Sequence, residues 1–285
     1  MEDSLFNQDY LVVADIAAKE RDSFIHLAIS ISIDQIKKHF SHFITTKESI
    51  TYERQNRRFN IRESEKFLKL ELSSKPTKAP SKTNFKELLL ELIKQEGLEI
   101  MTWSKKAINF KNRVNFVYTN GYKEFPDFSD KALLESLDIW LEPYLESITT
   151  LKALESLDIY SILLSQIDWQ KQQLLDSLAP KTIKVPSGSN ILVDYSDIKT
   201  PIMRVKIQEV FGLKSSPKIL DNSMALQLHL LTPAMRPIQI TYDLNSFWDS
   251  SYFEVRKELR GKYKKHYWPE NPLEAIATNR TKKHM

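Results

Sequence analysis

The 285-residue chain contains no cysteine and only five glycines. Without cysteine, the chain has no disulfides, thiolate metal sites or cysteine nucleophiles, and a reducing cytosol is the expected compartment. The glycines are also too widely spaced to form the GxxxxGK[ST] or GxGxxG patterns that bind nucleotide phosphates. The sequence therefore predicts no metal, no bound cofactor and no P-loop. The glycines are Gly97, Gly121, Gly188, Gly212 and Gly261.

The sequence also lacks long apolar runs. None approaches the roughly 18 residues that a membrane-spanning helix needs. The N-terminus, MEDSLFNQDY, is acidic and does not resemble a signal peptide. Hydrophobic residues make up 41% and charged residues 27% of the chain, close to globular averages. We therefore expect a soluble, cytoplasmic protein of one to three domains with no membrane partner.

The positive charge is concentrated at the C-terminal end. The whole chain has a formal net charge of +4, whereas residues 251–285 carry nine Lys and Arg against four acids, a net of +5. The remaining residues therefore sum to −1. This asymmetry indicates a partner that bears phosphates, although it says nothing about the fold.

Residues 9–72 have mostly the pattern of strands. DYLVVADIA, DSFIHLAISI and FLKLEL are predicted as strands, and SITYER with RRFNIRE as a hairpin. IDQIKKHF, at 33–40 between DSFIHLAISI and SITYER, is predicted as a short helix. SSKPTKAPSK, at 73–82, has the composition of a linker.

The middle of the chain has helical periodicity. ALLESLDIWLEPYL is predicted as one helix after a cap at Ser129, and LESLDI, which occurs at 134–139 and 154–159, predicts two similar helices. Trp103, Trp140, Trp169 and Trp248 lie in apolar stripes and are expected in the core.

The C-terminal part mixes strands and helices. TIKVPSGSNILVDY and LQLHLLTPAMRPIQITYDL are predicted hairpins, with MRVKIQEVFGL as a helix between them. A last helix is expected from about Ser246 to near Gly261. The fold class is therefore α+β and multi-domain, with a β-rich OB-like N-terminal module, a helical middle and a C-terminal domain of helices and hairpins. The predicted boundaries are 1–75 for the module, 76–83 for a linker, 84–179 for the helical domain, 180–279 for the C-terminal domain and 280–285 for a tail.

Several motifs carry a family resemblance. VPSGS, QEVFGL, LHLLTPAMRP and FWDSSYFEVRKELRGKYKKHYWPENP occur in this order. With WSKKAINFKNRVNF and FPDFSDKALLESL, they resemble the C-terminal region of the HrpB family of bacterial DExH-box ATP-dependent RNA helicases. The resemblance spans nearly the whole chain, with weaker motifs in residues 9–72, for which it implies an OB-like barrel.

The resemblance has two departures. In that family the ATPase motor, which uses ATP and Mg²⁺, lies in two RecA-like domains upstream, and this chain contains neither. The resemblance therefore implies an accessory region that is inactive alone, with helicase motor domains, in cis or in trans, as partners. The second departure is the pair Asp221 and Asn222, which stands where a glycine-containing turn is expected, and both residue types tolerate left-handed backbone.

The stretch RGKYKKHYWPENP, at 260–272, is the candidate site for single-stranded RNA or DNA. Its cations would neutralise phosphates and its aromatic rings would stack on bases. The alternative is that Trp268 and Tyr267 pack the tail on the core, while the lysines lie in solvent near a helix C-terminus. The candidate residues are Arg256, Arg260, Lys262, Tyr263, Lys264, Lys265 and Trp268.

Three functions remain open at this point. The chain could bind or guide single-stranded nucleic acid for a motor, or dock on that motor or another partner as a scaffold that does not contact RNA. An independent enzyme is the third, and the missing phosphate, metal and nucleophile motifs disfavour it most.

Overall fold

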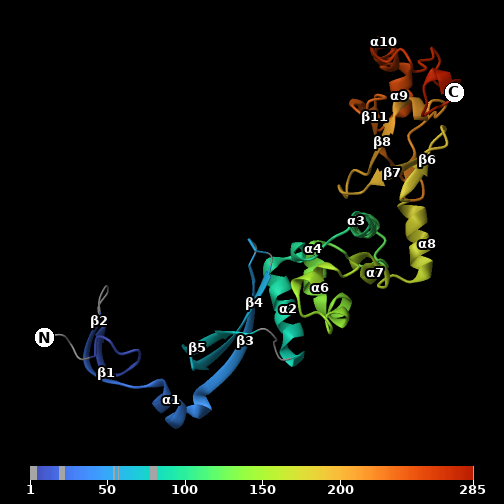
Figure 1. The fold of residues 1–285 in the computed structure, drawn as a ribbon. Helices are drawn as coiled ribbons and strands as arrows, with labels where there is room; N and C mark the ends of the chain where they lie inside the picture. Colours follow the sequence, from blue (N-terminus) through green and yellow to red (C-terminus); the bar gives the residue numbers. More distant parts are fainter. Residues whose placement is uncertain (1–4, 19–22, 54, 57, 78–81, 285) are drawn as a thin grey trace. The chain divides into compact units, whose positions relative to one another are not determined.

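The computed structural model describes residues 5–18, 23–53, 55–56, 58–77 and 82–284 (Figure 1). The chain divides into two compact units. The first comprises the described residues up to Ile100 together with Tyr144–Glu155. The second comprises Met101–Pro143 and the described residues from Ser156 onward. These boundaries differ from the predicted domains.

The first unit consists mainly of antiparallel strands. β1 pairs with β2, and β3, β4 and β5 form a separate three-stranded sheet in that order. The described strands therefore form two sheets, and the OB-like barrel stays a prediction. The elements are β1 (Leu11–Ala18), β2 (Ser23–Ser30), α1 (Ile33–His39), η1 (Ser41–Phe43), β3 (Ile44–Glu53), β4 (Arg58–Phe67), β5 (Leu70–Pro76), α2 (Lys82–Glu96), η2 (Leu98–Ile100) and α6 (Leu151–Glu155).

Two predictions for the first unit are wrong in detail. FLKLEL is not one strand: Phe67 ends β4, Leu68 and Lys69 form a tight turn with a Leu68 φ of +52°, and Leu70 begins β5 and pairs with Phe67. Part of the expected linker, Ser73–Pro76, belongs to β5 and pairs with β4, while residues 78–81 lie outside the described residues. Helix α2 also belongs to this unit, since Phe85 is buried and its ring lies 6.5 Å from that of Phe59.

Apart from α3, the helices of the second unit are short. Ser129 caps α4, as predicted, by accepting from the Ala132 amide. The expected long helix after it breaks at Ser136, whose hydroxyl donates to the Ala132 carbonyl and competes with the backbone ladder. The helices and 3-10 turns here are α3 (Lys105–Thr119), α4 (Asp130–Glu135), α5 (Leu137–Trp140), η3 (Glu142–Tyr144, which ends in the first unit), α7 (Ile159–Leu164), α8 (Trp169–Leu178), η4 (Ile207–Val210), α9 (Leu244–Asp249), α10 (Tyr252–Lys262) and η5 (Lys282–His284).

Both copies of LESLDI span a break between helices. The first covers the end of α4 and the start of α5, and the second covers the end of α6 and the start of α7. The prediction of two similar continuous helices is therefore wrong. The final helix is divided in the same way into α9 and α10, because the Ser250 hydroxyl donates to the Ser246 carbonyl at the junction.

A five-stranded sheet in the order β12-β11-β8-β7-β6 forms the centre of the C-terminal part. The two predicted hairpins, β6–β7 and β11–β12, are confirmed. The strands of this part are β6 (Thr182–Lys184), β7 (Asn190–Asp194), β8 (Ile202–Lys206), β9 (Lys218–Ile219), β10 (Met224–Ala225), β11 (Gln227–Leu231) and β12 (Pro237–Thr241).

The helix predicted for MRVKIQEVFGL is wrong. Residues 202–206 form β8, which pairs parallel to β11 and antiparallel to β7, and only the following 3-10 turn is helical. The strand period explains this outcome, because Met203, Val205 and Ile207 are buried while Arg204 is exposed. An apolar segment surrounded by two partner strands gains more from the sheet than from a short isolated helix.

Two residue-level predictions have opposite outcomes. Asp221 and Asn222 do adopt left-handed backbone, with φ of +52° and +65°, so they replace the expected glycine. Trp169, in contrast, is 70% exposed rather than part of the core. It is the first residue of α8, directly after the N-cap Asp168. None of the helices among the described residues is long and apolar enough to cross a membrane.

Candidate nucleic-acid interface

The C-terminal motif folds back onto α10. The Arg256 Nε donates to the Trp268 carbonyl at 3.1 Å, and its Nη2 lies 3.1 Å from a Glu270 carboxylate oxygen. The Tyr252 hydroxyl donates to the Pro269 carbonyl at 2.8 Å. These bonds hold the segment after Lys265 against the helix, so Arg256 is engaged within the fold.

The aromatic residues of the motif differ in exposure. Trp268 is 6% exposed, and its indole Nε1 donates to the Tyr263 carbonyl at 3.0 Å. Tyr263 is half-buried and its hydroxyl lies 3.4 Å from Thr232 Oγ1. The Tyr267 ring lies 6.4 Å from the buried Phe211 ring. A ring as buried as Trp268 has no face for a base, so its position agrees with the packing alternative.

The basic residues of the motif divide into paired and available cations. Lys262 forms an ion pair of 2.6 Å with Glu258, and this hydrogen bond raises the pKa of the Lys262 ammonium. Arg260, Lys264 and Lys265 are exposed, and none has an ion pair with another residue in the described part of the chain. Of the seven predicted residues, these three are therefore the cations available to a phosphate.

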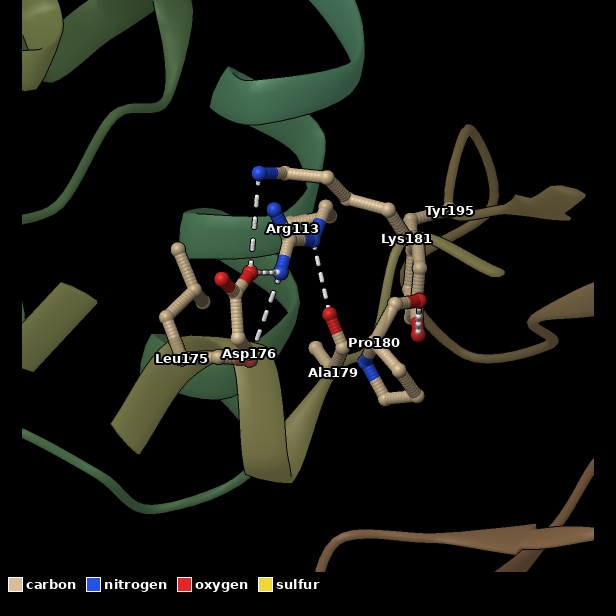
Figure 2. Close-up of polar contacts among 7 residues, drawn as sticks. All are labelled: Arg113, Leu175, Asp176, Ala179, Pro180, Lys181 and Tyr195. Carbon is tan, nitrogen blue, oxygen red and sulfur yellow. Dashed lines mark hydrogen bonds and ion pairs between the residues drawn. The ribbon is translucent and has the colours of Figure 1, made fainter. Parts of the chain in front are cut away.

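A second basic region begins at a buried arginine on α3. Arg113 is completely buried, and its Nε donates to the Ala179 carbonyl at 2.7 Å. Its Nη2 lies 2.5 Å from the Asp176 carboxylate and 3.4 Å from the Leu175 carbonyl (Figure 2). Charged hydrogen bonds of this kind are the strong ones in proteins. Arg113 thus joins α3 to the C-terminal end of α8.

Tyr195 strengthens the same connection between α3 and the C-terminal end of α8, which we call the Arg113 joint. The Tyr195 hydroxyl donates to the Pro180 carbonyl at 2.9 Å, and its ring lies 5.1 Å from the Phe116 ring of α3. Burial raises the pKa of the Tyr195 hydroxyl well above its usual value. Lys181, whose ammonium lies 3.7 Å from the Asp176 carboxylate, follows directly in the chain (Figure 2). The joint therefore fixes α3 relative to the start of the β6–β7 hairpin.

A groove of about 780 Å³ lies beside this joint, between α3 and the sheet. Its cations come from both sides: Lys105 and Lys106 from the first turn of α3, and Lys181 and Arg204 from the sheet side. Asp194 is the acid in this lining, and it forms a 2.6 Å ion pair with Arg204. Burial opposes ionisation of Asp194, but hydrogen bonds from Ser196 and Arg204 outweigh it and hold its pKa below the usual range.

The sequence predictions did not include Arg113 or the groove. The sequence did contain a sign that Arg113 is buried, because it lies on the same buried face of α3 as Phe110, Val114 and Val117. A cation in such a stripe indicates a paired arginine rather than a surface one. The groove had no such signal, since its cations are far apart in sequence and only the fold brings them together.

Comparison with known proteins finds similarity to ATP-dependent helicases. The family model HrpB_C, described as ATP-dependent helicase C-terminal, matches residues 140–272. The ATP-dependent RNA helicase HrpB of Escherichia coli (strain K12) is 32% identical over 286 residues, which cover 99% of this chain and 35% of the relative.

Solved structures agree with this class. The crystal structure of the E. coli DExH-box NTPase HrpB matches with a TM-score of 0.70 and 31% identity, over 98% of this chain and 35% of that one. The crystal structure of the E. coli DEAH/RHA helicase HrpB matches with a TM-score of 0.61 and 29% identity, over 93% and 34%.

These matches define the class as the C-terminal part of an ATP-dependent helicase. Over nearly its whole length the chain is similar to the C-terminal region of the HrpB family of these helicases. It spans about a third of the length of the relatives it matches.

Proposed function

We propose that this chain binds single-stranded RNA on behalf of an HrpB-type motor and does not hydrolyse ATP itself. The observation that carries the proposal is the group of exposed cations at the end of α10, Arg260, Lys264 and Lys265, without ion pairs among the described residues. Free cations release counterions from a phosphate backbone, whereas paired ones gain less. The E. coli relative is named an RNA helicase, which supports RNA over DNA as the ligand.

The test is binding of a single-stranded oligoribonucleotide to the 285-residue chain across a range of salt concentrations. Each phosphate contact on a single strand contributes about 0.7 to the slope of log K against log salt. Replacing Arg260, Lys264 and Lys265 together with Gln should therefore lower the slope by about 2 and weaken binding at low salt. A matched control replaces three other exposed lysines of the second unit with Gln and should bind as the parent does. These lysines are Lys199, Lys214 and Lys218.

Two results would contradict the proposal. One is that the parent chain does not bind RNA at low salt. The other is that the triple Gln variant and the control have the same affinity and salt slope. ATP turnover by the purified chain, with a contaminating motor excluded, would contradict the second half of the proposal, since the sequence contains no phosphate-binding loop.

A second candidate function is docking on the motor domains, and the β1–β2 hairpin favours it. Phe24, Leu27 and Ile29 of β2 are 56%, 62% and 66% exposed. Exposed apolar side chains clustered on one hairpin are typical of an interaction surface. If docking is the function, Leu27→Asp with Ile29→Asp should abolish binding of separately purified HrpB-type ATPase domains and leave RNA binding unchanged. Unchanged binding of those domains would exclude the hairpin as the docking surface.

A further inference from the structure

The groove between α3 and the sheet combines positive charge with an exposed apolar surface. Four cations line it against one acid, so its net charge is positive and an anionic occupant is favoured. Three of the cations already interact with another side chain. Arg204 forms an ion pair with Asp194 at 2.6 Å, Lys181 forms one with Asp176 at 3.7 Å, and the Lys106 ammonium lies 3.7 Å from the centre of the Tyr160 ring. Lys105 has no ion pair with any described residue.

The apolar part of the groove comes from β7. Val193 points into the core and is 1% exposed, so its neighbour Leu192 points to the opposite face, where it is 70% exposed. Ile191 contributes to the same lining. An inorganic phosphate would gain nothing from these side chains, whereas a nucleobase or ribose would be partly removed from water on them.

Two asparagines complete the lining. Asn109 lies on α3 and Asn190 begins β7, so one amide comes from each wall. An amide side chain both donates and accepts hydrogen bonds, which suits a base edge or a ribose hydroxyl. The groove has cations on both walls and apolar and amide groups between them. This arrangement fits a single-stranded nucleic acid, in which each nucleotide carries one negative phosphate and one planar base.

The two walls are held in place by the Arg113 joint. Arg113 lies one helical turn after Asn109 on α3, and it binds Asp176 and the carbonyl of Ala179, two residues before Lys181. The Tyr195 bond to the Pro180 carbonyl fixes the other end of β7 to the same point. A groove whose walls are fixed before binding loses less conformational entropy when a ligand enters. Arg113 is a positioning residue here, because it is completely buried and acts through its partners.

We propose that this groove binds one or two nucleotides of single-stranded RNA, with phosphates on Lys105, Lys181 and Arg204 and a base against Leu192. The inference rests on the proposed function, since it takes RNA as the ligand, but it assigns a second site that is separate in sequence from Arg260, Lys264 and Lys265. The volume of about 780 Å³ is in the range of small-ligand sites.

The test uses the full 285-residue chain, a trinucleotide of RNA as a short probe and a longer oligoribonucleotide. Leu192→Ser should weaken trinucleotide binding about tenfold, because an apolar contact with one base is lost. The matched control is Ile139→Ser, which removes a side chain of similar exposure, 67%, from α5 of the same unit. Lys105→Gln with Lys181→Gln should lower the salt slope by about 1.4, and Lys199→Gln with Lys218→Gln should not.

A second readout locates the probe. Photocrosslinking of a trinucleotide that contains 4-thiouridine should label the peptide that includes residues 190–194 in the parent chain. The label should be lost in the Lys105→Gln, Lys181→Gln variant. Arg113→Met should reduce labelling without removing any lining group, and Lys199→Gln with Lys218→Gln should retain it. Tryptophan fluorescence confirms that each variant is folded.

The outcomes distinguish the two proposals. The groove is supported if its variants lose the trinucleotide and the triple Gln variant at Arg260, Lys264 and Lys265 keeps it. The groove inference is overturned, and the proposed function stands, if the triple Gln variant loses RNA while the groove variants bind normally. It is also overturned if the groove variants lose binding of polyglutamate but keep RNA, since the groove then takes an acidic peptide. Absence of all RNA binding overturns both.

Discussion

The ion pair between Arg113 and Asp176 leads to an asymmetric prediction about stability. The Arg113 side chain is 1% exposed and the Asp176 side chain is 57% exposed. Removing the arginine leaves an acid that water can solvate, whereas removing the acid leaves a cation buried without its carboxylate. We therefore expect Asp176→Ala, a change at the surface, to cost more stability than Arg113→Met, a change in the core.

The magnitudes follow from the contacts. In Arg113→Met the methionine fills most of the volume, and the main loss is the donor to the buried Ala179 carbonyl, about 2 kcal/mol of unfolding free energy. In Asp176→Ala the guanidinium keeps only backbone carbonyl partners, at a cost of about 3 kcal/mol, the low end for a broken buried pair. The double variant should cost about as much as Arg113→Met alone, because the acid then has no buried cation to neutralise.

Urea unfolding followed by tryptophan fluorescence measures these differences. All tryptophans of the chain lie in the second unit, so the signal reports the unit that contains the ion pair. Lys181→Gln is the control, because Lys181 also lies near Asp176, and it should change stability by less than about 0.5 kcal/mol. A cost below about 1 kcal/mol for Asp176→Ala, typical of an isolated surface acid, would refute the reasoning. The tryptophans are Trp103, Trp140, Trp169, Trp248 and Trp268.

Three further predictions concern pH and backbone conformation. Burial raises the pKa of the Tyr195 and Tyr252 hydroxyls, so as pH rises they lose their protons in the unfolded state before they do so in the folded state. The free energy of unfolding should therefore fall as pH rises above about 10, which tyrosinate absorbance during alkaline unfolding measures. Burial and the nearby Lys206 lower the pKa of His266, so the unfolded state binds a proton more readily and stability should fall as pH falls below about 6.5. His266→Phe should remove part of this pH dependence, which urea unfolding at several pH values measures. Asn222 has a φ of +65°, so Asn222→Gly should be neutral or stabilising by up to about 1 kcal/mol in thermal unfolding, whereas Asn222→Val should destabilise; the reverse order would contradict the role of backbone strain.

Local patterns in the sequence were sufficient where neighbouring residues decide the structure. The predicted hairpin TIKVPSGSNILVDY forms with its turn at residues 186–189, where Gly188 has a φ of +85°, and the Ser129 cap depends only on its own side chain and the amide of Ala132. Patterns failed where partners distant in sequence decide. Residues 202–206 form a strand because β7 and β11 lie on either side of it, and neither strand is visible in the local period.

The composition of the candidate site was predictable from the sequence, but the contacts of its side chains were not. The sequence identified the basic character of the C-terminal motif but could not separate Arg260, Lys264 and Lys265 from the engaged Arg256 and Lys262. That distinction depends on Glu270 and Glu258. Glu258 is one helical turn from Lys262, but Glu270 reaches Arg256 only because the chain folds back after α10.

By itself, the sequence determined the resemblance to the HrpB family, the absence of a nucleotide-binding loop and the position of the basic end, because motif order, glycine spacing and charge are properties of the linear chain. Only the tertiary structure decided that Trp268 is buried, that Trp169 is exposed and that four cations of the second unit share one groove. The physical reason is that burial and charge neighbourhood arise from contacts between distant segments, and the energies of those contacts outweigh local preference.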